Sequence, residues 1–576
     1  MAPLTALPAS WGEPLLLGAW LAPLLGLLLL ALPRGRGPGM GWAPLWGLPA
    51  LAAGLLVADG TAVQWPWMLT GTRFAMDPVG RVFLLLAAIL WTAAAGFSRG
   101  YLGADAGRKA YPGFFLAAMA GNLGLTVAQD PVSFLAFFTL MGLPAYGLVV
   151  HSGTPFARHA ANVYLGATAG GEVLVLAGLL LMAGGGGTTA GALLLIAGLG
   201  SKAGLVPLHF WLPLAHPAAP APASAVLSGT MIKAGLLGWI RFLPLGEAAF
   251  PELGRVLIAL GLAGAFLAVA VGLPQRDPKT VLAYSSISQM GWLAAAVGAG
   301  MAAPAAWSGL LPAVLAYAFH HGLAKGALFL STAVTGERAG GRFGRVLLWT
   351  AVVLPALAIA GLPGTSGGAA KKGLKEALTH TPGLAAWDFA TLLTAGAAAT
   401  TLLMVRFLVV LRGGGAGRGL DARALAWWGA VVAASLLLPW LWPRLSYWNL
   451  KTLSAAELVD GLQPVVAAAL LGLAWAWAAK RFRLPGIPPI PAGDLYAGLE
   501  AGTRWLGKRT TGLWQPLGAL WRPYNRIWVA VYTHLWLPSR QRLTAADRWG
   551  WGTSGAAFLL ILAALAWALF PPGAGS

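Results

Sequence analysis

Residues 200–217 read GSKAGLVPLHFWLPLAHP, and this stretch decides what kind of protein the chain is. It combines a lysine, two histidines and three prolines, and it lies between long apolar runs. An unpaired charge is costly in a protein core and in the hydrocarbon of a membrane. The segment must therefore house something polar inside an otherwise apolar structure.

The composition is that of a membrane protein. The chain has 576 residues, of which 58% are hydrophobic and 10% are charged, whereas a soluble domain is about 25% charged. Apolar runs of about 20 residues recur, and each can cross about 30 Å of hydrocarbon as a helix. We predict an all-α polytopic membrane protein with about sixteen transmembrane helices. Their centres are expected near residues 23, 50, 88, 120, 141, 172, 197, 233, 263, 290, 320, 353, 399, 434, 468 and 560.

The chain contains no cysteine. Disulfides and thiolate-held iron–sulfur clusters are therefore excluded within it, and any redox chemistry belongs to partner subunits. No glycine-rich nucleotide loop and no nucleophile elbow occurs either, so we expect no catalytic site, metal or cofactor in this chain. The net charge of +20 lies mostly in loops between apolar runs, so the expected neighbour is membrane lipid and not nucleic acid.

Basic residues alternate between loops. Six alternate loops contain most of them: Arg34 and Arg36; Arg99, Arg108 and Lys109; Arg158; Arg276 and Lys279; Arg338, Arg342 and Arg345; and Arg412, Arg418 and Arg423. The intervening loops have fewer, chiefly Arg73, Arg81, Arg255, Arg444 and Lys451. By the positive-inside rule the first set is cytoplasmic, which places both termini on the periplasmic side of a bacterial inner membrane. The first apolar run lacks a basic leader, so we expect a retained helix there.

Two apolar segments are interrupted by glycine and proline beside lysine. They are GSKAGLVPLHFWLP (200–213) and AGLPGTSGGAAKKGL (360–374). Such paired broken helices are typical of transporters built from inverted repeats, with the ion path at the breaks. They would be the seventh and twelfth spans, which indicates repeats of about five helices. The predicted parts are residues 1–110 for helices one to three, 111–245 and 246–415 for the two repeats, 416–480 for helices fourteen and fifteen, 481–548 for an interfacial segment and 549–576 for the last helix.

Residues 481–548 differ in character from the rest of the chain. LPGIPPIP (484–491) breaks any helix, and leucines then recur at helical spacing opposite charged residues. Tryptophans continue through this basic stretch: Trp505, Trp514, Trp521, Trp528 and Trp536. We predict a lateral amphipathic segment along the membrane surface or along neighbouring subunits. A disordered basic loop is the alternative.

Few ionisable residues lie inside the predicted spans. They are Glu172, Lys202, His209, Lys233, His320, His321, Lys325, Lys371, Lys372 and Arg406. Hydrocarbon penalises such groups, so they are candidates for function by default. Because burial disfavours the charged form of lysine, a chain of buried lysines and histidines is a plausible proton relay.

Some of these residues also have a structural interpretation. His209 could simply hydrogen-bond the broken backbone beside Pro207. Arg406 is expected to reach the cytoplasmic face or to pair with a carboxylate. His321 and Lys325 are four residues apart and share a helix face, so His321 is preferred to His320 as a relay residue.

The candidate residues lie in segments that resemble a known family. The segments are KAGLVPLHFWLPLAHPAAPAPASAVLSGTMIKAGLLGWIR (202–241), DPKTVLAYSSISQMGW (277–292), HHGLAKGALFLSTA (320–333) and, nearer the N-terminus, MDPVGRVFLLL with FSRGYL (76–102). They are similar to the antiporter-like, proton-translocating subunits of respiratory complex I, Mrp-type sodium/proton antiporters and group 4 membrane-bound hydrogenases. The HPAAP and SGTMIK segments are most similar to the large membrane subunit of formate hydrogenlyase. The resemblance covers about residues 70–380.

The resemblance implies roles for individual residues. Lys202 matches the lysine of the family's broken seventh helix, and Lys233 matches the connecting lysine of the eighth. His321 and Lys325 match the central relay of the eleventh helix, and Lys371 matches a lysine near the exit. His209, His320 and Lys372 are secondary candidates. The family's long members also use a lateral segment as a brace along neighbouring subunits.

One position departs from the family pattern. The family usually has a glutamate in the fifth helix that pairs with the lysine of the seventh, but here FFTLMGLP (137–144) places Thr139 there. Glu172 in the sixth helix is the only other deep carboxylate available. We expect Glu172 to have taken over the pairing with Lys202; without a replacement the chain would be an impaired pump or one with another coupling logic.

Three functions follow from the resemblance. The first is a proton-translocating subunit of a complex I-like or hydrogenase-4-like respiratory complex, driven by iron–sulfur redox chemistry in a peripheral arm. The second is an Mrp-type Na⁺/H⁺ antiporter subunit. The third is a membrane partner of an inorganic-carbon uptake complex. Each of them requires further subunits.

Overall fold

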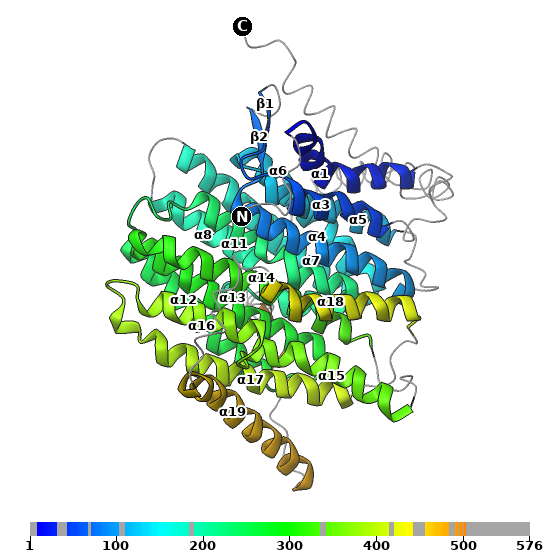
Figure 1. Ribbon diagram of the computed structural model, residues 1–576, viewed down its shortest axis with the longest axis vertical. Coiled ribbons are helices and arrows are strands. Elements are labelled where there is room, and N and C mark those ends of the chain that lie inside the picture. The colour runs from blue at the N-terminus through cyan, green and yellow to red at the C-terminus, as the bar shows by residue number, and fades with distance from the viewer. Residues whose placement is uncertain are drawn as a thin grey trace, which may run out of the picture.

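The computed structural model describes residues 9–31, 43–66, 71–102, 110–183, 189–334, 341–413, 420–441, 455–482, 490–494, 496–498, 500 and 502. These residues form a bundle of helices (Figure 1). The α-helices are α1 (Ala9–Ala31), α3 (Leu48–Leu56), α4 (Pro78–Leu102), α5 (Tyr111–Val127), α6 (Pro131–Val149), α7 (Pro155–Leu181), α8 (Thr189–Ala203), α9 (Leu212–Ala218), α10 (Ala221–Val226), α11 (Lys233–Phe242), α12 (Pro251–Gly272), α13 (Pro278–Ala302), α14 (Trp307–Ser331), α15 (Gly341–Ala360), α16 (Ser366–Thr379), α17 (Phe389–Gly413), α18 (Ala422–Leu441) and α19 (Ala455–Arg481).

The predicted class is confirmed: this is a helical, multi-pass membrane protein. Among the described residues, 11 helical stretches are long and apolar enough to cross a membrane. The predicted centres from residue 23 to residue 468 all lie within helices. The centre near residue 560 lies outside the described residues, so the total of about sixteen spans stays a prediction.

A small β-hairpin was not predicted from the sequence. Strand β1 (Ala62–Trp65) pairs antiparallel with β2 (Thr72–Ala75), with Ala62 opposite Ala75. The hairpin lies in the connection between α3 and α4, where Trp65 packs edge-on against Phe74 with ring centroids 5.6 Å apart. Strand pairing satisfies the hydrogen bonds of backbone N–H and C=O groups that lie outside helices.

The connections gather at two opposite ends of the bundle. At one end Asp77 Oδ1 accepts from Gln129 Nε2 at 2.9 Å and from Arg241 Nη2 at 3.0 Å. Helix α12 runs from that end to the other, where Arg406 Nη2 donates to the Gln275 carbonyl at 2.7 Å. The distribution of basic residues predicts that the loops at these two ends lie on opposite sides of the membrane. Which end faces the cytoplasm stays a prediction.

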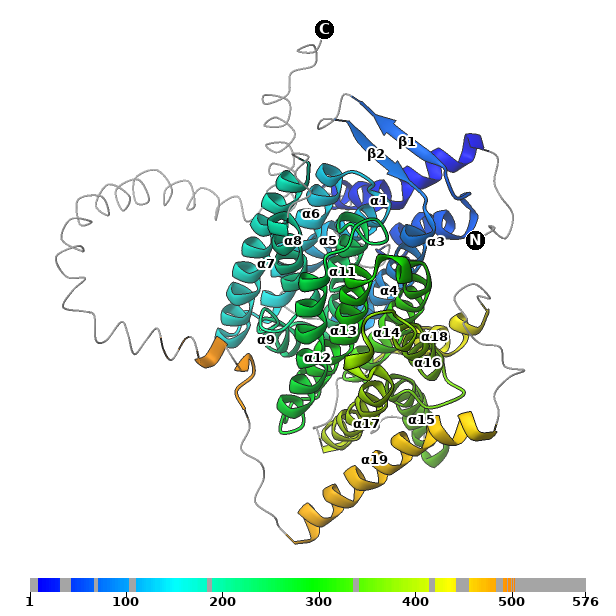
Figure 2. The ribbon, with the colours of Figure 1, turned by 90° about the vertical axis from the view of Figure 1, so that its left-hand side faces the viewer.

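Burial falls from the centre of the bundle to its edge. All of an 18-residue apolar window within Pro304–Ser331, which contains α14, is buried, whereas 11% of the corresponding window within Leu458–Ala479 of α19 is buried. Helix α19 lies along the outside of α17 (Figure 2), and it exposes large apolar side chains such as Leu471 and Trp477. Such surfaces suit lipid or neighbouring membrane subunits. Polar side chains are instead concentrated in the central helices.

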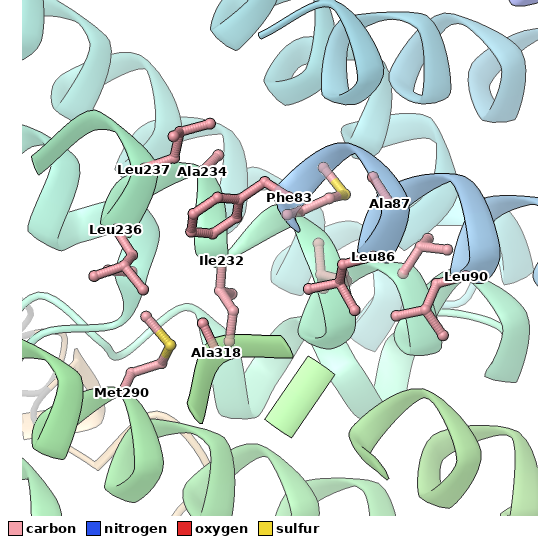
Figure 3. Packing of buried hydrophobic residues seen from close by; sticks show 14 of the residues in the cluster. Phe83, Leu86, Ala87, Leu90, Ile232, Ala234, Leu236, Leu237, Met290 and Ala318 are labelled. Carbon is pink, nitrogen blue, oxygen red and sulfur yellow. The ribbon is translucent and has the colours of Figure 1, made fainter. Parts of the chain in front are cut away.

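Small residues let the central helices approach one another closely. Between α10 and α11 the chain forms a π-helical turn, η6 (Leu227–Met231). A Cβ atom added at Gly229 would lie 2.4 Å from Leu90 Cδ1 and 3.0 Å from the Gly322 carbonyl oxygen. Figure 3 shows Phe83 of α4 beside Ile232, with Leu86 and Leu90 farther along α4. This tight packing fixes the position of α11, which contains Lys233, relative to α14, which contains Lys325.

Both predicted breaks are present. Helix α8 ends at Ala203 and α9 begins at Leu212, while α15 ends at Ala360 and α16 begins at Ser366. Each break opens with a glycine of positive φ, Gly204 at 79° and Gly361 at 95°, a conformation that L side chains rarely adopt. The inverted-repeat relation and the part boundaries stay predictions.

Much of the predicted C-terminal organisation lies outside the described residues. This holds for Trp505, Trp514, Trp521, Trp528 and Trp536 and for the last helix over 549–576. The lateral amphipathic segment therefore stays a prediction, and only a few of its positions between residues 490 and 502 are described.

Candidate functional site

The lysine–histidine axis is the set Lys202, Lys233, His321, Lys325 and Lys371. Lys233, Lys325 and His321 are 0% exposed, and Lys202 is 4% exposed. Lys371 is partly buried. Ionisable groups buried to this degree require partners or a functional setting.

Lys202 lies at the C-terminal end of α8, directly before the first break. Its Nζ donates to Tyr164 OH and to Thr168 Oγ1, both at 3.3 Å. It also lies 5.4 Å from the ring centroid of Phe138, within the range of a cation–π interaction. Helices α6 and α7 thus enclose the ammonium group.

Glu172 lies beside Lys202 and is bound by Thr139. Thr139 Oγ1 donates to Glu172 Oε2 at 2.8 Å, while Oε1 is buried without a hydrogen-bond partner in the described protein. A Cβ atom added at Gly142 would lie 2.7 Å from Glu172 Oε1 and 3.3 Å from Lys202 Nζ. The two charged groups therefore border one glycine, and Lys202 acts electrostatically on the carboxylate without a direct ion pair. This geometry supports the hypothesis that Glu172 replaces the missing glutamate, which stays a prediction.

Gly142→Ala is expected to lower proton transport by about tenfold to a hundredfold. The new methyl group would enter the space between Glu172 and Lys202, and displacement of reacting groups by about 1 Å can cost about a hundredfold in rate. Proton uptake by inverted membrane vesicles measures the effect. Gly166→Ala is the matched control, because a Cβ atom there meets nothing within 4 Å. Equal transport by the two variants would contradict this interpretation of Gly142.

Lys233 and Lys325 are joined by a chain of polar contacts. Lys233 Nζ donates to the Ser228 carbonyl at 2.7 Å, and the Ser228 and Ser286 hydroxyls lie 2.8 Å apart. The Leu282 carbonyl accepts from Ser286 Oγ at 3.0 Å and from Lys325 Nζ at 2.9 Å. Ser228 lies in the π-helical turn η6, a feature that often marks functional sites. The serine link, defined as Ser228 and Ser286, was missed in the sequence because serines are common in apolar spans.

Two imidazoles lie near the same lysines. His321 and His216 are 0% exposed, and none of their four ring nitrogens has a hydrogen-bond partner in the described protein. Both interact electrostatically with Lys233 and Lys325. His216 stacks on Phe329 with ring centroids 4.3 Å apart. An imidazole nitrogen can bind or release a proton, and because His216 shares the burial and the lysine neighbours of His321, it joins His321 as a candidate that the sequence did not single out.

The second break brings His320 and Lys371 to the far end of the axis. His320 Nδ1 lies 2.8 Å from Ser366 Oγ at the start of α16. Lys371 Nζ donates to the Ala360 carbonyl across the break at 3.0 Å, and it interacts electrostatically with His320. Lys372 instead pairs with Glu376 at 3.7 Å and has a more exposed side chain. Lys371 is therefore the lysine that faces the break.

Arg406 and His209 were also given structural interpretations from the sequence. Arg406 donates from Nε and Nη2 to the Gln275 carbonyl in the loop after α12 and binds no carboxylate among the described residues, while its reach to the cytoplasmic face stays a prediction. His209 does not bond the broken backbone beside Pro207; its Nε2 lies 3.1 Å from Asp494 Oδ2. Asp494 comes from the segment after α19, which folds back onto the break.

The described residues hold no group of three or more His, Cys, Asp or Glu side chains that could bind a metal ion. The axis instead offers amines, imidazoles and hydroxyls. These are groups that exchange protons.

Comparisons with known proteins confirm the resemblance seen in the sequence. Residues 128–394 match the family described as NADH:quinone oxidoreductase/Mrp antiporter, transmembrane. Hydrogenase-4 component B of Escherichia coli (strain K12) is 29% identical over 337 residues, which are 52% of this chain and 50% of that protein. NAD(P)H-quinone oxidoreductase chain 4 of Prochlorococcus marinus subsp. pastoris is 31% identical over 288 residues, covering 44% and 51%. The chain thus spans about half the length of the curated relatives it matches.

Solved structures share the fold. A chain of the Mrp complex from Dietzia sp. DQ12-45-1b superposes with a TM-score of 0.73 at 24% identity, covering 92% of this chain and 63% of that one. A chain of the membrane-bound sulfane sulfur reductase, an archaeal respiratory membrane complex, gives 0.61 at 21% identity, covering 80% and 99%. At these identities the likeness establishes the architecture alone.

Proposed function

We propose, from the premise that residues 128–394 are an antiporter-like domain of the NADH:quinone oxidoreductase/Mrp antiporter family, that this chain is a proton-translocating subunit of a larger membrane complex. The observation that supports it most strongly is the polar link between Lys233 and Lys325 at the buried centre of the bundle. Both buried amines donate to backbone carbonyls, and the two serine hydroxyls lie between these carbonyls. Polar groups placed in this way have no evident use in a purely structural core, where apolar packing would cost less.

The axis is suited to protons rather than to sodium ions. Hard metal cations prefer oxygen ligands, particularly carboxylates. Glu172 is the carboxylate that lies beside a lysine of the axis, at Lys202, whereas lysines and histidines recur along it. Protonated amines would also repel a metal cation. Protons, which bind to the amine and imidazole nitrogens themselves, are the ions that fit this path.

The transport mechanism follows from repulsion between neighbouring charges. In a medium of low dielectric two nearby lysines resist being charged together. When Lys325 accepts a proton, the charged state of Lys233 becomes less favourable, and Lys233 releases its proton toward Lys202. The negative charge of Glu172 then stabilises the proton on Lys202. When this interaction weakens, Lys202 releases the proton. Each step moves one proton from one nitrogen to the next without other chemistry in this chain.

The driving force would come from partner subunits. The relatives are named as parts of hydrogenase-4 and of NAD(P)H-quinone oxidoreductase, so a redox arm with iron–sulfur clusters is the partner we propose. The exposed apolar faces of α7 and α19 offer surfaces for neighbouring membrane subunits. We place the complex in a bacterial inner membrane, with the termini of this chain on the periplasmic side.

The first experiment identifies the partners. The tagged protein is purified in mild detergent, and every co-purifying subunit is identified by mass spectrometry. Hydrogenase-like or dehydrogenase-like subunits with iron–sulfur clusters would support the proposal. Recovery of small hydrophobic subunits alone would indicate the Mrp-type antiporter, and a single large zinc protein would indicate the carbon-uptake complex.

Ser286→Ala is expected to slow proton pumping by about tenfold, because it removes the hydroxyl that joins Ser228 to the Leu282 carbonyl. Pumping is measured as dye quenching in inverted vesicles, normalised to the amount of complex. Ser288→Ala is the control, since Ser288 lies on the same helix and donates at 2.7 Å to the Ala265 carbonyl away from the link. Equal pumping by the two variants would argue against a proton route through the serine link.

A further inference from the structure

Asp494 joins three elements at the first break. Its Oδ2 lies 3.1 Å from Nε2 of His209, which is in the break between α8 and α9. Tyr284 OH of α13 donates to the same oxygen at 3.2 Å. The side chains of His209 and Asp494 are 6% and 12% exposed. A carboxylate from a distant part of the chain thus contacts the break between α8 and α9.

The segment around Asp494 is fixed against the bundle on both sides. Gln275 Nε2 donates to the Ile490 carbonyl at 2.9 Å, and Tyr496 stacks on Phe210 with ring centroids 5.7 Å apart. Gly493 has φ of 87°, and a Cβ atom there would lie 3.0 Å from Leu214 Cδ1. Figure 2 shows this short segment beside α9 and the end of α7. The contacts orient the carboxylate toward the break.

His209 has one ring nitrogen on Asp494 and one that is available. Its Nδ1 is buried and has no hydrogen-bond partner in the described protein. Such an imidazole can accept a proton at one nitrogen and release another from the opposite nitrogen. A histidine that only anchored a segment would be expected to satisfy both nitrogens when buried.

The break connects His209 to the axis. Trp211 Nε1 donates at 2.8 Å to the carbonyl of Ser201, the residue before Lys202. The last turn of α8 and the start of α9 are therefore fastened together around the break. His209 belongs to the stretch of chain between these two helices, and its Nε2 contacts Asp494.

We infer that Asp494 and His209 form a proton-exchange site at the mouth of the axis, with the carboxylate supplied by the segment that follows α19. Asp494 takes a proton from water and passes it to His209 Nε2, while His209 Nδ1 releases a proton into the break toward the Lys202 amine. Tyr284 orients the carboxylate by its hydrogen bond. The inference rests on the proposed function and adds a residue outside residues 128–394 to it.

Asp494→Asn is the test, because asparagine keeps the shape and the hydrogen-bonding oxygen but does not carry a proton at neutral pH. In the assembled complex we expect pumping, normalised to the amount of complex, to fall to about a tenth or less. Asp494→Glu, which restores an acid, is expected to recover at least about half of it. Asp460→Asn on the exposed surface of α19 is the matched control and is expected to pump like the wild type.

Three outcomes would overturn the inference: wild-type pumping by Asp494→Asn, loss of assembly with unchanged pumping per complex, or no recovery with Asp494→Glu. The first two would make Asp494 a brace, and the third would show that its acid group is not what matters. Lys325→Ala, measured in parallel, keeps the two proposals apart. If Lys325→Ala also pumps normally, the proposed function itself fails; if only Asp494→Asn does, the inference alone fails.

Discussion

Lys325→Ala is expected to abolish proton pumping while the complex still assembles. Lys325 is 0% exposed, and its Nζ ends the polar link to Lys233 by donating to the Leu282 carbonyl at 2.9 Å. Alanine removes the proton-accepting amine and also the charge that displaces the proton of Lys233. Removal of a positioned proton-transfer group typically costs about a hundredfold to ten-thousandfold in rate. The measurement is dye quenching in inverted vesicles, with the partner subunits' turnover recorded in the same sample.

Lys375→Ala provides the control for this prediction. Lys375 is on α16 and its Nζ donates to Thr394 Oγ1 at 3.0 Å, away from the axis. We expect this variant to pump normally. Alanine leaves a cavity at this buried position but also removes a buried amine, so recovery of the assembled complex is measured in the same sample. Pumping by Lys325→Ala at the wild-type rate would remove the central residue of the proposed mechanism.

Patterns that are local in sequence could be predicted. Apolar runs locate the helices because a span is fixed by hydrocarbon thickness. Gly204 and Pro207 beside Lys202, and Gly361 and Pro363 before Lys371, indicated both breaks because glycine and proline end helices wherever they occur. The preference for Lys371 over Lys372 could not be reached in this way. Both lie in one short helix, and the break alone decides which of them faces inward.

Contacts between distant residues could not be predicted. Asp494 and His209 are 285 positions apart, so no local spacing relates them. Ser228 and Ser286 are 58 positions apart, and a serine in an apolar span usually satisfies its hydroxyl on its own helix. The contact between Thr139 and Glu172 was easier to predict. The family's carboxylate is missing at residue 139, and few other carboxylates lie at membrane depth.

Glu172→Gln is expected to lower pumping by at least about tenfold, with assembly unchanged. Glutamine can keep the hydrogen bond from Thr139 Oγ1, which is 2.8 Å long in the structure, but it lacks the negative charge that acts on Lys202. Tyr164 and Thr168 would still solvate the ammonium group, so the loss falls on proton transfer and not on folding. Glu252→Gln is the control, because Glu252 is exposed at the start of α12 and pairs with Arg255 at 3.1 Å. Undiminished pumping by Glu172→Gln would show that this carboxylate is not the partner of Lys202.

An exchange of the two residues tests the position of the charge. Thr139 on α6 and Glu172 on α7 are in direct contact. The double variant Thr139→Glu with Glu172→Thr therefore moves the carboxylate to α6 and keeps a hydroxyl beside it. We expect the exchange to recover pumping to at least about a third of the wild-type rate, since the charge stays near Lys202 across the same glycine. Recovery would mean that a carboxylate near Lys202 is required and that either helix can provide it. Pumping no better than that of Glu172→Gln would mean that the carboxylate has to be held by α7, at the position that Glu172 occupies in the structure.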